Sequence, residues 1–239
     1  MFRRVIRICF YTFSMYVVTH LVVFVLLPFG LLVSAFNKKR IPKLKKRFVE
    51  ILFRLVGKKP EVLGLENIEE GKAYLIVPNY PSFYASFAMI GVFPEASIVA
   101  HAFILKVPLL SQFLRQMGAI FVNPKRGRSA LKAIDMGLKF VGGITSVLIF
   151  PEGQRTPDGQ IHKFKRGFIY ILKQSSLDLL PVTLNGFYRM KPMKRFYFDP
   201  DTKPEIIIHK SISNSRVREM SEKDLLEETT KIIGRFYRP

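Results

Sequence analysis

The chain has 239 residues, of which 49% are hydrophobic, and its 38 lysines and arginines against 18 aspartates and glutamates give a net charge of +20. The apolar content excludes a disordered chain, and the single cysteine, Cys9, excludes a scaffold held by intrachain disulfides. The length fits one globular domain of about 100–200 residues with an appendage. Nucleic acid, an anionic membrane and a phosphorylated substrate all attract such a charge, so its distribution along the chain has to discriminate among them.

The N-terminal fifth of the chain combines a long apolar run with clustered positive charge. Residues 1–47 carry ten lysines and arginines and no acidic residue, and residues 8–37 carry no charged residue. This run is longer than the roughly 20 residues that a helix needs to cross the hydrocarbon core. It is also longer than the apolar core of a signal peptide, which has about 7–15 residues. We therefore expect a membrane-embedded helical segment within residues 1–57.

Pro28 and Gly30 interrupt the apolar run. Because such residues bend or break helices, we expect a long apolar helix up to about residue 27 and a second, amphipathic helix over about residues 31–56. The first helix either spans the bilayer or enters one leaflet. The basic cluster at residues 38–47 outweighs the arginines before the run. This asymmetry predicts that the cluster, and the globular domain after it, lie on the cytoplasmic face of the membrane.

Residues 58–239 form the second predicted unit and alternate short apolar runs with segments of helical length. Runs rich in β-branched and aromatic residues predict strands at 74–77, 97–100, 119–122, 146–150, 179–184 and 205–209. Helices are predicted at 82–92, 108–117, 129–141 and 167–175, and an amphipathic helix at 221–237 closes the chain. This alternation predicts an α/β domain with a mostly parallel sheet flanked by helices. Ligands of such sheets bind at the loops that follow the strands.

The loop after the fourth predicted strand has the most informative pattern, Phe150-Pro151-Glu152-Gly153-Gln154-Arg155-Thr156. Gly153 permits a close backbone approach, and Arg155 offers a planar fork of donors that suits a phosphate. Glu152 is placed to hold that fork in position. For the loop taken alone, an ordinary turn with an internal Glu–Arg pair is the alternative.

Three further blocks give this loop its context. They are residues 77–86, Gly118-Ala119-Ile120-Phe121-Val122-Asn123 and Leu180-Pro181-Val182. In this order the four blocks resemble the glycerolipid acyltransferase superfamily, which includes the 1-acylglycerol-3-phosphate (lysophosphatidate) O-acyltransferases, over residues 63–186. The resemblance implies that Glu152, Gly153 and Arg155 bind the phosphate of the acceptor, together with a basic residue of the second block. It also implies that the block around Pro181 lines the side of the acyl donor.

The first block departs from the pattern of that family. The family has Asn-His, four residues and then Asp; its His is the general base for the acceptor hydroxyl, and its Asp orients the His. Here Asn79 and Ser82 match, but Tyr80 stands in the place of the His and Ala85 in the place of the Asp. A phenol with a pKa near 10 is protonated at neutral pH. Loss of a positioned base typically costs about 10²–10⁴ in rate.

No other histidine restores the pair, because none of the four has an acidic residue five positions later. His101, which follows a predicted strand, is the histidine best placed to approach the cleft. The second block also departs from the family, since Pro124 stands where its arginine is expected. The basic residues that remain for the phosphate are Lys125, Arg126, Arg128, Lys165 and Arg166.

Two functions of different classes follow. The first is a membrane-bound acyltransferase of phospholipid biosynthesis, which transfers a fatty acyl group from acyl-CoA or acyl carrier protein, as co-substrate, to 1-acylglycerol-3-phosphate or a similar lysolipid, without a further cofactor. The second is a pseudoenzyme that binds membrane phospholipid or a partner without acyl transfer. A nucleic-acid binder is disfavoured, because half of the charge flanks the apolar run and no recognition motif is present. No metal site is expected, because no cluster has metal-ligand spacing.

Overall fold

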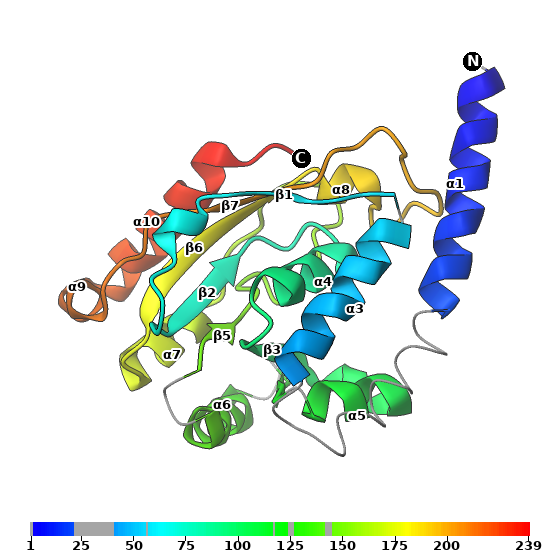
Figure 1. The fold of residues 1–239 in the computed structure, drawn as a ribbon. Coiled ribbons are helices and arrows are strands. Elements are labelled where there is room, and N and C mark those ends of the chain that lie inside the picture. Colours follow the sequence, from blue (N-terminus) through cyan, green and yellow to red (C-terminus); the bar gives the residue numbers. More distant parts are fainter. Residues whose placement is uncertain (1, 22–40, 56, 117, 124–126, 142–144) are drawn as a thin grey trace.

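The computed structural model describes residues 2–21, 41–55, 57–116, 118–123, 127–141 and 145–239 (Figure 1). These residues form a seven-stranded sheet with the strand order β1-β7-β6-β2-β5-β3-β4. The strands are β1 (Glu61–Leu63), β2 (Tyr74–Pro78), β3 (Ser97–His101), β4 (Ile120–Val122), β5 (Val147–Leu148), β6 (Asp178–Asn185) and β7 (Glu205–Ile208). All neighbouring pairs are parallel except β6 and β7. The predicted α/β fold with a mostly parallel sheet is confirmed.

Helices cover both faces of the sheet (Figure 1). The first core lies between the sheet and the helices α1 (Phe2–Leu21), α3 (Ile41–Leu55), α4 (Phe83–Val92), α5 (Pro108–Gln116) and α8 (Phe187–Met190). The second lies under α6 (Gly127–Val141), α7 (Gly167–Gln174), α9 (Asn214–Glu219) and α10 (Glu222–Phe236). Along β2, Tyr74 and Ile76 face the first core, and Leu75 and Val77 face the second. This alternation of a fully buried strand is what a sheet covered on both sides requires.

The N-terminal helix α1 lies beside the domain (Figure 1). Thr12 and Met15 are buried on its inner side, and the Thr12 Oγ1 accepts a hydrogen bond from the Phe198 N–H at 3.0 Å. The helix ends at Leu21 among the described residues, and the expected bend at Pro28 and Gly30 lies outside them. Within the ranges given above, no helix is both long and apolar enough to cross a bilayer.

The expected amphipathic second helix corresponds to α3 over the part of it that is described. Phe48, Val49, Leu52 and Phe53 are buried on one side of α3, which packs against α4. Helical spacing places Lys45 on this same side. Its Nζ donates to the Ala96 carbonyl at 3.4 Å, and burial lowers its pKa to about 8. Lys45 is therefore a core residue, which corrects its assignment to a lipid-facing basic cluster, whereas Lys43, Lys46 and Arg47 are exposed.

Candidate functional site

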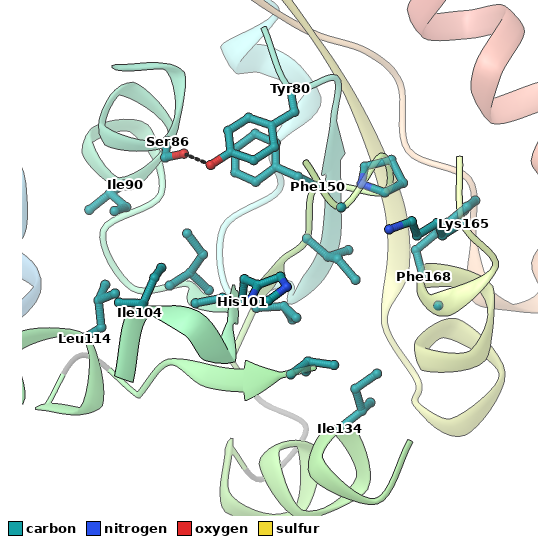
Figure 2. Close-up of a pocket in the computed structure, with 18 of the residues that line it drawn as sticks. Tyr80, Ser86, Ile90, His101, Ile104, Leu114, Ile134, Phe150, Lys165 and Phe168 are labelled. Carbon is teal, nitrogen blue, oxygen red and sulfur yellow. Dashed lines mark hydrogen bonds between the residues drawn. The ribbon is translucent and has the colours of Figure 1, made fainter. Parts of the chain in front are cut away.

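An apolar cavity of about 410 Å³ lies at the carboxyl ends of β2, β3, β4 and β5, between α4, α5, α6 and α7. Its volume is within the range of about 300–1,000 Å³ that is usual for small-molecule sites. Among the described residues that line it, polar side chains come from Tyr80, Ser86, His101 and Lys165. Figure 2 shows Tyr80 and Ser86 at one end of the cavity, Lys165 on the opposite side and His101 between them. This cavity lies at the edge of the sheet where the sequence predicts ligand binding, beyond the carboxyl ends of parallel strands.

Tyr80 is the second residue after β2, and its ring is stacked on Phe150. The ring centroids are 4.0 Å apart at an interplanar angle of 22°. Its hydroxyl accepts a hydrogen bond from the Ser86 Oγ at 3.2 Å (Figure 2). Burial raises the pKa of Tyr80, and the Ser86 hydrogen bond and the charge of Arg155 lower it only partly. Tyr80 is thus a neutral phenol whose own proton remains free to donate, which is the opposite of what a general base must do.

Ala85 is the third residue of α4 and is fully buried. Its methyl group has no acceptor with which to orient a neighbour. The polar partner of Tyr80 is instead Ser86, one residue later. Ser82 caps α4, because its Oγ accepts the Tyr84 N–H at 3.2 Å. The helix start is thereby fixed, and it holds residues 80–86 at the end of the cavity.

Asn79 joins this block to the neighbouring strand. Its Oδ1 accepts the Leu184 N–H at 2.7 Å, and its Nδ2 donates to the Leu184 carbonyl at 3.1 Å. The side chain is almost fully buried, so both bonds replace water for a polar group that could not otherwise be satisfied. Asn79 therefore fixes the turn after β2 against β6. Pro181, in β6 opposite Val77, is buried in the sheet and is not among the residues that line the cavity.

Glu152 joins the loop after β5 to the turn after β2. Its Oε1 accepts the Tyr80 N–H at 2.7 Å, and its Oε2 accepts the His162 N–H at 3.0 Å. The side chain is only 4% exposed. Burial raises the pKa of this carboxyl, and the two backbone N–H groups oppose that shift. Both oxygens accept backbone amides, and no ion pair between Glu152 and Arg155 is present in the described chain, contrary to the expectation from the sequence.

Gly153 and Lys165 lie against each other at the edge of the cavity. Gly153 has a φ of +71°, and a Cβ on it would lie 2.6 Å from the Lys165 Nζ. A side chain at position 153 would therefore displace the ammonium group. The Lys165 backbone N–H donates to the Pro151 carbonyl at 2.8 Å, which holds the lysine beside the loop. Lys165 thus presents its charge to the cavity (Figure 2).

Arg155 is half-buried, is not among the residues that line the cavity, and makes no hydrogen bond or ion pair within the described residues. Its charge acts on two neighbours. It opposes the raised pKa of Tyr80, and it adds to the effect of burial in lowering the pKa of Lys191. Lys165, which lines the cavity, and Arg155, whose charge acts on Tyr80 of the lining, are therefore two cations that have no carboxylate partner among the described residues. Such a pair is suited to an anionic head group on an apolar chain.

The remaining candidates are distributed differently. Lys125 and Arg126, and the side chain of Arg128, lie outside what the structure describes. Arg166 lies 3.6 Å from Glu222 of α10. The His101 Nδ1 accepts the Phe103 N–H at 3.0 Å, so the proton of the neutral ring is on Nε2 and this nitrogen is a donor. His101 is therefore no ready substitute for the missing base. Ser86 was not predicted as a site residue, because no motif indicates a role for a serine one residue after the position of the family Asp, which Ala85 occupies here.

Comparisons with known proteins agree with this geometry. Residues 59–185 match the sequence profile of the Acyltransferase family. The chain is similar to the 1-acyl-sn-glycerol-3-phosphate acyltransferases of Borreliella burgdorferi, with 30% identity over 74% of this chain and 71% of that protein, and of Pseudomonas aeruginosa, with 36% identity over 59% and 55%. It thus spans about half the length of the second. The fold is similar to the crystal structure of the 1-acyl-sn-glycerophosphate (LPA) acyltransferase from Thermotoga maritima, with a TM-score of 0.81 at 24% identity over 97% of this chain and 95% of that one.

Proposed function

The chain belongs to the glycerolipid acyltransferase superfamily, and we propose that it is a membrane-bound protein of phospholipid biosynthesis that binds a phosphorylated lysolipid and an acyl thioester at the cavity. The observation that carries the proposal is a pair of cations without carboxylate partners in the described chain: Lys165, which lines an apolar cavity of about 410 Å³, and Arg155, whose charge acts on Tyr80 of the same lining. A lysophosphatidate has the matching chemistry, an anionic phosphate and a long hydrocarbon chain. Glu152, whose oxygens are occupied by backbone amides, acts by positioning the loop.

The reaction of this site is acyl transfer. The acceptor hydroxyl attacks the thioester carbonyl of acyl-CoA or acyl carrier protein, a C–O bond forms, the C–S bond breaks, and the hydroxyl proton ends on the departing thiol. A general base accelerates this step by taking the proton during the attack. Tyr80 is a neutral donor and Ala85 carries no charge, so we expect the chain as it stands to turn over slowly.

A second candidate function follows from the same residue. The Tyr80 hydroxyl accepts a hydrogen bond from the Ser86 hydroxyl. Tyr80 is therefore accommodated in the site without a general base beside it, and the cavity can still bind a ligand. A pseudoenzyme that holds a phospholipid in the cavity, without acyl transfer, fits this arrangement. The two candidates share their ligand chemistry and differ in turnover, which is measurable.

Membrane attachment is part of the proposal, and α1 supports it. The side of α1 that faces away from the domain exposes five apolar residues at helical spacing, which are Ile6, Phe10, Phe13, Val17 and Leu21. Phe10 and Phe13 are 72% and 69% exposed. An apolar stripe of this kind, with arginines at one end of the helix, suits the boundary between head groups and acyl chains. The excess of positive charge in residues 38–47 favours the cytoplasmic face.

Turnover of labelled lysophosphatidate with acyl-CoA or acyl carrier protein tests the reaction. The double substitution Tyr80→His with Ala85→Asp restores the family pair, and we expect it to raise turnover by about 10² or more over the native chain. Tyr80→His with Ala85→Asn is the matched control. The asparagine amide is similar in size to the aspartate carboxylate, but it carries no charge that could stabilise a protonated histidine. High native turnover that the restored pair does not increase would refute the account of the missing base.

A further inference from the structure

We propose that the loop Lys191-Pro192-Met193-Lys194-Arg195-Phe196-Tyr197, hereafter the 191–197 loop, is a second membrane-contacting element that inserts into the surface of an anionic bilayer next to α1. The loop follows α8 and runs toward α1 (Figure 1). None of the four blocks of the family pattern includes it. The inference rests on the proposed membrane attachment and extends it to a part of the chain far from the N-terminus.

The first observation is what the loop exposes. Phe196 is 74% exposed, Met193 is 42% and Tyr197 is 40%. The loop contains Lys191, Lys194 and Arg195 and no acidic residue. Large apolar and aromatic side chains among lysines and arginines suit the interface between anionic head groups and acyl chains.

The second observation is that the loop is held in place by α1. The Tyr16 ring is stacked on the Phe196 ring with centroids 5.0 Å apart, and the Tyr16 hydroxyl donates to the Phe196 carbonyl at 2.9 Å. Two residues after Phe196, the Phe198 N–H donates to the Thr12 Oγ1 of α1. Arg7 of α1 also forms an ion pair with Asp201. The loop is therefore held against α1, the helix that carries the exposed apolar stripe.

The third observation concerns the charges of the loop. The Arg195 guanidinium donates to the Arg189 carbonyl at 2.7 Å and to the Tyr197 hydroxyl at 3.2 Å, and it lies 4.5 Å from the centre of the Tyr197 ring. Its Nε is buried without an acceptor in the described chain. Lys191 donates to the carbonyls of Pro192 and Arg195. Neither cation has a carboxylate partner among the described residues, so no acidic side chain there neutralises their charge.

A lipid surface fits these observations better than a protein partner. A protein partner would need to bury the loop and the exposed stripe of α1 together and to neutralise the cations. A bilayer meets both requirements. Its hydrocarbon region buries Phe196 and Met193, and its phosphates form ion pairs with Lys194 and Arg195. The loop also lies near Arg155, since Lys191 and Arg155 share an electrostatic interaction. The cations of the site are thus near the membrane from which a lysolipid would come.

The chain contains no tryptophan, so one introduced indole reports on one position. The variants are Phe196→Trp in the loop, Phe13→Trp on α1 and Leu65→Trp in the short helix Leu65–Asn67, where Leu65 is 56% exposed. Each full-length protein is reconstituted with vesicles of phosphatidylcholine and phosphatidylglycerol, with or without brominated acyl chains. We expect quenching and a blue shift of emission in F196W and F13W, and neither in L65W.

The outcomes separate the two claims. Quenching of F13W without quenching of F196W would overturn the role of the loop and leave membrane attachment by α1 intact. Absence of quenching in both would refute membrane attachment itself. Equal quenching of L65W would indicate general adsorption and would also overturn the inference. Met193→Trp repeats the measurement in case F196W does not fold. Lys194→Glu is expected to weaken binding to the anionic vesicles by severalfold, whereas Lys210→Glu, also an exposed lysine, is expected to leave it unchanged.

Discussion

Tyr80 shows how one substitution can alter the chemistry of a site while its surroundings are kept. The ring fills the end of the cavity by stacking on Phe150, and Ser86 supplies a hydrogen bond to the hydroxyl. The backbone around it is held by the carboxylate of Glu152 and the amide of Asn79. Asn79 and Glu152 are residues of the family blocks. The residues that hold the backbone of the site therefore match the family, whereas Tyr80 differs from it.

Glu152 gives the first prediction at this scale. Glu152→Gln replaces one oxygen with an amide NH₂, which then faces a backbone N–H donor. We expect this change to lower the free energy of unfolding by about 1–3 kcal/mol, because a buried donor is left unsatisfied. Urea denaturation measures it. Glu66→Gln, at an exposed position, is the matched control. Equal stability of E152Q and the native chain would mean that the two hydrogen bonds of Glu152 do not hold the loops together.

The sequence predicted the vacancy of the catalytic pair but not its structural consequence. Tyr80 and Ala85 are identified by their spacing alone. The hydrogen bond from the Tyr80 N–H to Glu152 depends on how the loops after β2 and β5 meet, and residues 72 positions apart give no local signal of that contact. The expected pairing of Glu152 with Arg155 was wrong for this reason.

At the scale of elements, strong periodicity predicted well and short elements were missed. The predicted strands correspond to β2, β3, β4, β6 and β7, whereas only Val147–Leu148 of the predicted run 146–150 is strand. The three-residue strand β1 was not predicted, because Glu61–Leu63 gains its strand partner only from β7, far along the chain. The short helices α8 and α9 were missed as well, since four and six residues are too few to show a helical period.

The docking of α10 gives a prediction about pH. The Thr183 hydroxyl in β6 donates to the Ile233 carbonyl of α10 at 3.0 Å and accepts from the His209 Nε2 at 2.7 Å. Burial lowers the pKa of His209 to about 4. The unfolded chain therefore binds this proton first as the pH falls, and the free energy of unfolding is expected to decrease between about pH 6.5 and pH 4.

Urea denaturation across this pH range tests the role of His209. His209→Gln keeps a donor toward Thr183 and removes the titrating group, so its stability is expected to fall less with acidification than that of the native chain. His162→Gln removes an exposed histidine and serves as the control. The same acid dependence in H209Q and the native chain would show that another group causes it.

At the scale of the whole molecule, the net charge of +20 has several separate roles. Lys45 is buried in the core, Lys165 lines the cavity, and the charge of Arg155 acts on Tyr80 of the same lining. The 191–197 loop carries further cations toward the proposed bilayer. The sequence located the N-terminal cluster and the Arg155 loop. It gave no indication of the 191–197 loop, because the contact between Tyr16 and Phe196 joins segments 180 residues apart.

We propose that Arg155 binds the phosphate of a lipid whose chain occupies the cavity. Calorimetric binding of a short-chain lysophosphatidate tests this most directly. Arg155→Ala is expected to weaken this binding about tenfold or more, since a charge-assisted hydrogen bond contributes about 1.5–3 kcal/mol. Binding of the corresponding monoacylglycerol, which has no phosphate, is expected to be unaffected, as is lysophosphatidate binding by Arg235→Ala on α10. Unchanged lysophosphatidate affinity in R155A would contradict the account.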